Sequence, residues 1–207
     1  TYVHALDDVY VMAGQGTIGL EIAEQCPEAD TVVVPIGGGG LISGVATALK
    51  GTLDDVRVIG VQAEGASSVA RSLEKGKRHE LDAVDTIADG IATRSVGEKP
   101  WEIIQERVDE VVTVSDNEIA LALTYLLERS KTLVEGAGAV ALAAVLAEKF
   151  DYADDEVIVP ALCGGNIDLN DLTTVVVRGL VQMGRYVKLR TELKDNPGSL
   201  ERLVEII

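Results

Sequence analysis

Four consecutive glycines, Gly37, Gly38, Gly39 and Gly40, carry the clearest chemical signal in this sequence. They follow a run of aliphatic residues and precede a helical pattern that begins at Leu41. Glycine lets the backbone approach a ligand closely, and successive N–H groups at a helix start attract an anion such as phosphate. A glycine-rich turn for tight helix packing is the alternative. Because four glycines cost more chain entropy than such a turn requires, we favour a phosphate cradle.

The run does not match the common nucleotide-binding patterns. No Gly-Lys-Ser/Thr follows it, and the last place of Gly-x-Gly-x-x-Gly is Ile42 or Ser43, depending on where counting starts. The sequence therefore gives only weak support to a nucleotide as the ligand.

Strand and helix patterns alternate around this run, which predicts an α/β fold with a largely parallel sheet flanked by helices. A capping box at Ser115 and Glu118 marks one helix start, residues 76–98 are predicted to form a long functional loop, and residues 173–177 are also strand-like. The predicted strands are 31–36, 57–62, 110–114 and 156–162, and the predicted helices are 17–25, 41–50, 67–75, 101–108, 119–126, 138–149 and 168–183.

Composition limits the class of protein. The 207 residues are 47% hydrophobic but only 3% aromatic, so the core must be aliphatic, as parallel sheets prefer. The formal charge of −16 disfavours nucleic acid and anionic membranes as partners. It fits either an ordinary acidic protein or one adapted to high salt. Two cysteines do not make a disulfide framework, and no aliphatic run approaches the roughly 20 residues of a membrane span. We therefore expect a soluble, cytoplasmic chain.

Five motifs occur in an order that resembles the fold-type-II pyridoxal-phosphate enzymes, whose nearest members are threonine dehydratases, with serine racemase and serine dehydratases as relatives. The resemblance implies that residues 1–184 form the carboxy-terminal portion of the catalytic domain and that pyridoxal phosphate is the cofactor. The motifs are Ala-Gly-Gln-Gly-Thr-Ile-Gly at 13–19, Pro-Ile-Gly-Gly-Gly-Gly-Leu at 35–41, Ile-Ala-Asp-Gly at 87–90, Glu-Gly-Ala-Gly-Ala at 135–139 and Leu-Cys-Gly-Gly-Asn-Ile-Asp at 162–168.

The same resemblance implies roles for particular residues. The four glycines and Leu41 would bind the cofactor phosphate through backbone amides, and Gly90 would place its backbone near the ring. Glu135 would lie close to the pyridine edge, or would be a carboxylate favoured by a helix start. Cys163 would meet the pyridine nitrogen, where a weak thiol partner leaves that nitrogen largely unprotonated. The alternative for Cys163 is a small buried hydrophobe.

Two family features are not matched. Some relatives hold a divalent cation between an acidic residue at the position of Glu64 and an Asp further on, but Ala70 stands at that second place, so we expect no metal. The family also needs a lysine that binds the cofactor covalently. No lysine here lies in an apolar run, and the resemblance implies that this lysine and the substrate-carboxylate loop lie upstream of Thr1. We therefore expect no catalytic residue in the chain and no activity from it alone.

The last residues, 185–207, resemble the start of an ACT regulatory domain. The similar segments are Gly-Arg-Tyr-Val-Lys-Leu-Arg at 184–190 and Asp-Asn-Pro-Gly-Ser-Leu at 195–200. Alternating apolar and charged residues predict a half-exposed strand over 187–194, and Leu200, Leu203, Val204 and Ile207 predict a helix. An ordinary strand-turn-helix is the alternative.

These resemblances imply a threonine ammonia-lyase, which converts L-threonine to 2-oxobutanoate and ammonia. We expect it to be a homo-oligomer regulated by an amino acid such as isoleucine at the ACT domain. A serine racemase or serine dehydratase acting on L-serine is the first alternative. A non-catalytic amino-acid-binding module is the second.

Overall fold

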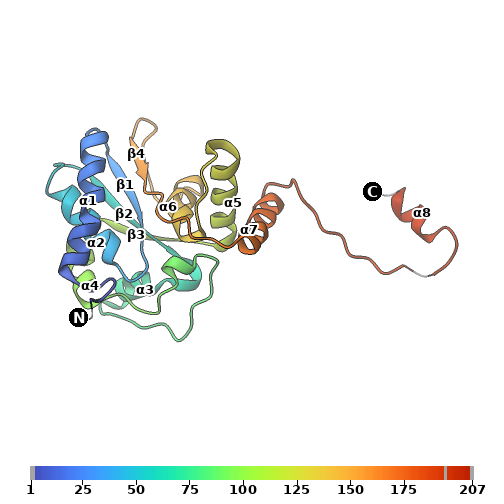
Figure 1. The fold of residues 1–207 in the computed structure, drawn as a ribbon, viewed down its shortest axis with the longest axis horizontal. Helices are drawn as coiled ribbons and strands as arrows, with labels where there is room; N and C mark the ends of the chain where they lie inside the picture. Colours follow the sequence, from blue (N-terminus) through green and yellow to red (C-terminus); the bar gives the residue numbers. More distant parts are fainter. Residues whose placement is uncertain (1–2, 194, 206–207) are drawn as a thin grey trace.

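A parallel sheet of four strands forms the centre of the molecule (Figure 1). The computed structural model describes residues 3–193 and 195–205. The strands β1 (Thr31–Pro35), β2 (Arg57–Ala63), β3 (Glu110–Val114) and β4 (Ile158–Pro160) lie in the order β3-β2-β1-β4. All three neighbouring pairs are parallel. The predicted α/β class and parallel sheet are therefore confirmed.

Each central strand packs against a hydrophobic core on both of its faces. Val33 of β1 lies opposite Ile59 of β2, and both belong to one core. Val32 and Val34 point the other way, into a second core that also contains Val58. Successive side chains of a strand alternate between faces, so burial of both faces explains why these strands read as unbroken aliphatic runs.

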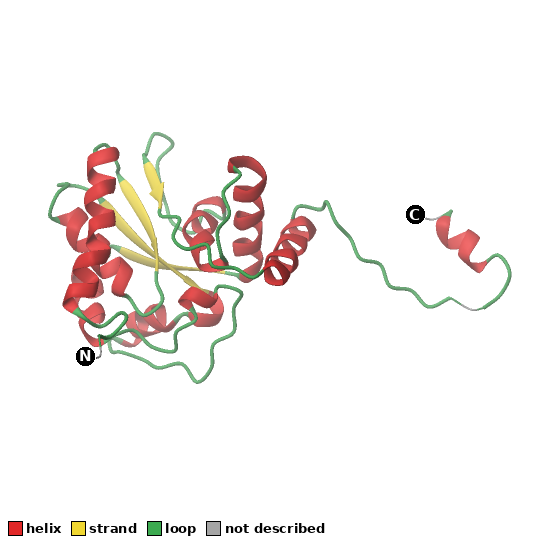
Figure 2. Cartoon of the chain, in the orientation of Figure 1, coloured by secondary structure: helices red, strands yellow, loops and turns green. Residues whose placement is uncertain are grey.

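Helices cover the two faces of the sheet (Figure 2). One face carries α1 (Val9–Gln25), α2 (Gly40–Lys50) and α4 (Glu98–Arg107), and the other carries α5 (Asp116–Tyr125), α6 (Gly136–Leu146) and α7 (Leu169–Gln182). The remaining helical segments are α3 (Ser68–Lys75), α8 (Ser199–Val204), the short turns η1 (Glu64–Ala66) and η2 (Asp89–Ile91), and the π-helical η3 (Leu126–Ser130). Within the described residues, none of the helices is both long and apolar enough to cross a bilayer.

The first helix begins at Val9, so the predicted start at Thr17 is wrong. Asp8 caps the helix: its Oδ1 accepts hydrogen bonds from the N–H groups of Tyr10 at 2.8 Å and Val11 at 3.3 Å. Glycines obscure the apolar pattern of this first half. Gly16 allows α1 to pack closely against α2, because a Cβ on it would lie 3.1 Å from the carbonyl oxygen of Gly44 in α2.

Most other predicted elements form with shifted ends. The capping box of Ser115 and Glu118 is present at α5, which runs on into the unpredicted π-helix η3. Helix α6 spans Gly136–Leu146 and not 138–149, and β4 is shorter than the predicted 156–162. Residues 173–177 lie in α7, which excludes the strand alternative there. The predicted long loop at 76–98 is present and contains the short turn η2.

The strand predicted over 187–194 does not form at residues 187–193, and Lys194 lies outside the described residues. A strand needs a neighbour to accept and donate its ladder hydrogen bonds, and this segment runs away from the main body without one among the described residues (Figure 1). The predicted helix is present as α8, but it buries none of its residues, and Ile207 lies outside the described part of the chain. The division at residue 184 stays a prediction.

Candidate functional site

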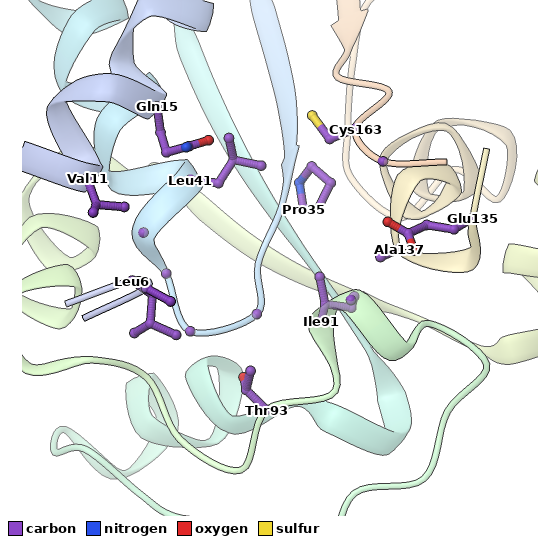
Figure 3. Close-up of a pocket in the computed structure, with 17 residues that line it drawn as sticks. Leu6, Val11, Gln15, Pro35, Leu41, Ile91, Thr93, Glu135, Ala137 and Cys163 are labelled. Atoms are coloured by element: carbon purple, nitrogen blue, oxygen red, sulfur yellow. The ribbon is translucent and has the colours of Figure 1, made fainter. Parts of the chain in front are cut away.

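One cavity of about 410 Å³ is lined by all eight residues to which the sequence assigned a ligand contact (Figure 3). It opens where β1 ends and is lined by residues of the glycine run, of η2 and of the start of α6, and by Cys163. Its volume falls in the usual range of small-molecule sites, roughly 300–1,000 Å³. The residues concerned are Gly37, Gly38, Gly39, Gly40, Leu41, Gly90, Glu135 and Cys163.

The glycine run forms a tight link from β1 to α2. Gly39 has φ of +94° and is the N-cap of α2, whose first residue is Gly40. The N–H of Gly97 holds the loop from outside by donating to the carbonyl oxygen of Gly38 at 3.0 Å. This N-cap has no side chain, so the first amides of α2 receive no side-chain cap and can donate to an anion.

Neighbouring groups leave the run little room for side chains. A Cβ on Gly37 would lie 3.1 Å from the Cα of Ile91, and one on Gly40 would lie 3.0 Å from the carbonyl oxygen of Leu6. A Cβ on Gly38 would meet the Leu6 side chain at 2.1 Å. The glycines are therefore needed for packing, and the binding of a phosphate by their amides stays a prediction.

Another part of the cavity wall joins three chain segments. A Cβ on Gly90 in η2 would lie 2.9 Å from the Cβ of Ala137 in α6 and 3.5 Å from Oε1 of Glu135. Glu135 is the N-cap residue of α6, but its side chain makes no capping hydrogen bond. Its carboxylate points toward the cavity instead (Figure 3). Glu135 is thus both at a helix start and on the cavity wall.

Cys163 lies on this wall beside Gly164, whose φ is +91°. Burial raises the pKa of the Cys163 thiol, so the sulfur keeps its proton at neutral pH. It can donate or accept a weak hydrogen bond but presents no negative charge. Cys26 does not line the cavity and packs against the core around α2, in agreement with a structural role.

The match to a family model identifies the class of protein. Residues 1–164 match the model described as "Pyridoxal-phosphate dependent enzyme". The chain belongs to the pyridoxal-phosphate-dependent enzymes. Its parallel sheet and flanking helices are those of the fold-type-II members.

Comparison with individual proteins shows which members of this family the chain resembles. The L-threonine ammonia-lyase of Geobacter sulfurreducens is 53% identical over 203 residues, which cover 98% of this chain and 50% of that protein. Among solved structures, threonine deaminase isoform 2 from Solanum lycopersicum has a TM-score of 0.81 at 37% identity, covering 87% of this chain and 50% of that one. Maize serine racemase has a TM-score of 0.78 at 38% identity, covering 88% and 56%. The chain spans about half the length of the curated relatives it matches.

The cavity fits the family's coenzyme. The amides at the start of α2 have no side-chain cap and are suited to a phosphate, and Gly90 has no side chain that would keep a flat ring away. Cys163 offers a neutral partner for a ring nitrogen. No lysine or arginine is among the residues described as lining this cavity, so attraction of an anion there would rest on the backbone N–H groups at the start of α2.

The metal site was expected to be absent. Glu64 and Ala70 both line a different cavity, together with Arg71, Lys75 and Lys149. Within the described residues, no three histidine, cysteine, aspartate or glutamate side chains gather closely enough to hold a metal ion.

A supporting network was not predicted from the sequence. Oδ1 of Asp116 accepts hydrogen bonds from the Thr86 hydroxyl at 2.6 Å and from the Ile87 N–H at 3.2 Å. Its Oδ2 lies 3.3 Å from Nη1 of Arg178 in α7. The network fixes the loop that carries Gly90. No short sequence pattern could have indicated it, because Asp116 lies about 30 residues beyond the loop and about 60 before Arg178.

Leu6, Gln15 and Thr93 also line the cavity and were not predicted (Figure 3). Gln15 belongs to the motif at 13–19, which was the one available signal for it.

Proposed function

We propose that this chain is the coenzyme-binding part of a threonine ammonia-lyase, which converts L-threonine to 2-oxobutanoate and ammonia. The observation that carries the proposal is the single cavity in which the glycine run, Gly90, Glu135 and Cys163 meet. The 53% identical L-threonine ammonia-lyase supports the choice of reaction.

In this proposal the amides of Gly37 to Gly40 and of Leu41 hold the coenzyme phosphate. Gly90 would place its backbone near the ring, and Cys163 would meet the ring nitrogen. When bound, pyridoxal phosphate supplies an electron-withdrawing ring that makes the Cα proton of an amino acid acidic. A neutral thiol at the nitrogen leaves the ring only moderately electron-withdrawing, which suits an elimination in which the departing hydroxyl carries away the negative charge.

A lysine must hold the coenzyme and move the Cα proton. None of the lysines that the structure describes lines the cavity. The proposal therefore places this lysine, and the loop that binds the substrate carboxylate, in a part of the protein outside these 207 residues. The chain alone should bind the coenzyme weakly and release no ammonia.

Regulation and assembly belong to the same proposal. We assign residues 185–207 to the start of an ACT domain that binds an amino-acid effector such as isoleucine. Two L-threonine ammonia-lyases match this chain over 203 and 206 residues, so both matches extend beyond residue 184. This supports assigning the last residues to a domain of the same enzyme. A homo-oligomer in the cytoplasm is the setting that we expect.

A serine racemase or serine dehydratase is the second candidate, and the likeness to maize serine racemase favours it. A non-catalytic amino-acid sensor, the third, has no observation in its favour beyond the exposed carboxy-terminal segment.

The test uses the complete protein with pyridoxal phosphate. We expect 2-oxobutanoate and ammonia in equal amounts from L-threonine, with slower turnover of L-serine and no D-serine. Formation of D-serine as the main product would replace the proposal by the racemase. Isoleucine binding without any coenzyme binding in calorimetry would replace it by the sensor.

A further inference from the structure

Thr93 has a buried hydroxyl that lacks a hydrogen-bond partner. Its Oγ1 is closed off from solvent and bonds to no other group in the described part of the chain. Buried polar groups are nearly always paired, so each exception needs a physical reason. A threonine hydroxyl that only filled space would be replaced without cost by the methyl group of valine.

The position of Thr93 in the cavity wall explains why its hydroxyl has no partner within the chain. It lines the cavity described above, on the side of the glycine run (Figure 3). A Cβ on Gly37 would lie 3.5 Å from Cγ2 of Thr93, so this side chain stands directly beside the first glycine of the cradle. A rotation about the Cα–Cβ bond to another staggered rotamer can bring Oγ1 to the position beside Gly37 that Cγ2 now holds.

The backbone around Thr93 is held in place. The Thr93 N–H donates to the carbonyl oxygen of Ile91 at 2.8 Å, and Nε of Arg94 donates to the carbonyl oxygen of Leu81 at 2.9 Å. The unsatisfied hydroxyl therefore belongs to a fixed segment of the cavity wall, where a ligand can supply the missing acceptor.

We propose that Thr93 is a further ligand-binding residue, whose hydroxyl donates a hydrogen bond to an anionic oxygen of the molecule bound beside Gly37. The inference rests on the proposed function, in which two anions enter this cavity: the coenzyme phosphate and the substrate carboxylate. No cation lines the cavity within the described residues, so a neutral donor next to the glycine amides adds directly to anion binding.

Three variants of the complete protein test this. Thr93→Val keeps the shape and removes the hydroxyl, and Thr93→Ser keeps the hydroxyl. Ser68→Ala is the matched control, because Ser68 Oγ is also buried and unpaired but Ser68 does not line this cavity. The measurements are the thermal midpoint without ligand, the dissociation constants of pyridoxal phosphate and of pyridoxal, and KM for L-threonine.

We expect ligand-free T93V to be at least as stable as wild type, since it loses an unsatisfied group. Its affinity should fall about tenfold, the usual effect of losing a hydrogen bond to a charged group. T93S and S68A should bind as wild type does. If T93V binds pyridoxal phosphate more weakly but binds pyridoxal as wild type does, the coenzyme phosphate is the acceptor. If only KM for L-threonine rises, the substrate carboxylate is the acceptor.

Wild-type values of all these constants in T93V would overturn the assignment, and so would a T93S variant as impaired as T93V. A clear drop in the ligand-free thermal midpoint of T93V would also overturn it, because the hydroxyl would then be structural. If wild type binds the coenzyme but forms no 2-oxobutanoate, the proposed reaction fails while the affinity comparison still decides the role of Thr93.

Discussion

The Glu135 side chain occupies the space in which a side chain on Gly164 would stand. A Cβ on Gly164 would lie 2.0 Å from Oε1 of Glu135, and the Glu135 N–H donates to the carbonyl oxygen of Gly164 at 3.2 Å. The start of α6 and the segment that carries Cys163 therefore pack closely against each other where Glu135 meets Gly164. A substitution at Gly164 should therefore displace both the start of α6 and the segment that carries Cys163.

Gly164→Ala should destabilise the protein and weaken coenzyme binding. The positive φ of +91° alone costs a residue with a Cβ about 1–2 kcal/mol, and the new methyl group must also displace Glu135. Gly76→Ala is the control, because Gly76 has φ of +65° but open space around it. Urea unfolding should show a larger loss for G164A than for G76A, and only G164A should bind pyridoxal phosphate more weakly. Equal losses in both variants would contradict the fit between Gly164 and Glu135.

The two cysteines should differ in protection by the coenzyme. Burial raises the pKa of both thiols, helped at Cys26 by the carboxylate of Glu28, so both should react slowly with iodoacetamide at pH 7 and faster at higher pH. Pyridoxal phosphate should slow the alkylation of Cys163 and leave that of Cys26 unchanged, as followed by mass spectrometry of peptides. Protection of Cys26 instead would move the binding site elsewhere.

Asp116→Ala should loosen the loop that carries Gly90. The substitution removes the acceptor of the Thr86 hydroxyl and of the Ile87 N–H, which should cost about 1–3 kcal/mol of stability. Coenzyme affinity should fall as well, because the backbone of Gly90, which lines the cavity, is no longer fixed. Asn117→Ala is the comparison: its Oδ1 accepts from Arg178 at 2.6 Å but does not touch the loop. Affinities of D116A and N117A that both equal wild type would show that the network does not position Gly90.

Stability should depend on pH through Glu118. Burial alone raises the pKa of this carboxyl, but hydrogen bonds from Lys149 and Ser115 outweigh it and lower the pKa below the ordinary 4.5. Since the pKa is lower in the folded than in the unfolded protein, the stabilisation is present above about pH 4.5 and is lost as the pH falls through the folded value. Urea unfolding of wild type and E118Q should therefore differ at pH 7 and converge toward pH 3. A difference that stays constant with pH would exclude this contribution.

Local patterns predicted the elements whose signals lie within a few neighbouring residues. The aliphatic runs before Gly37 and around Ile59 read correctly as strands, because burial on both faces requires them to be apolar throughout. The capping box at Ser115 is likewise a contact between residues three positions apart. The glycine run could be recognised in the sequence because the residue type itself determines the backbone conformation and leaves the amides without side chains.

Features that depend on distant contacts could not be predicted in this way. The early start of α1 is hidden because Gly14 and Gly16 interrupt the apolar pattern, and Gly16 is explained only by its neighbour Gly44. The strand expected over 187–194 has the right alternation but is absent over 187–193, because strand formation also requires a partner. The unpaired hydroxyl of Thr93 is visible only once the fold surrounds it.

The contact between α1 and α2 has a thermodynamic consequence for the cradle. A Cβ on Gly44 would lie 2.1 Å from the carbonyl oxygen of Met12 and 2.6 Å from the Gly16 nitrogen, so the two helices touch backbone to backbone. Amides at the start of α2 are thereby oriented before any anion arrives. Binding then loses little conformational entropy, since the receptor is already in its final shape.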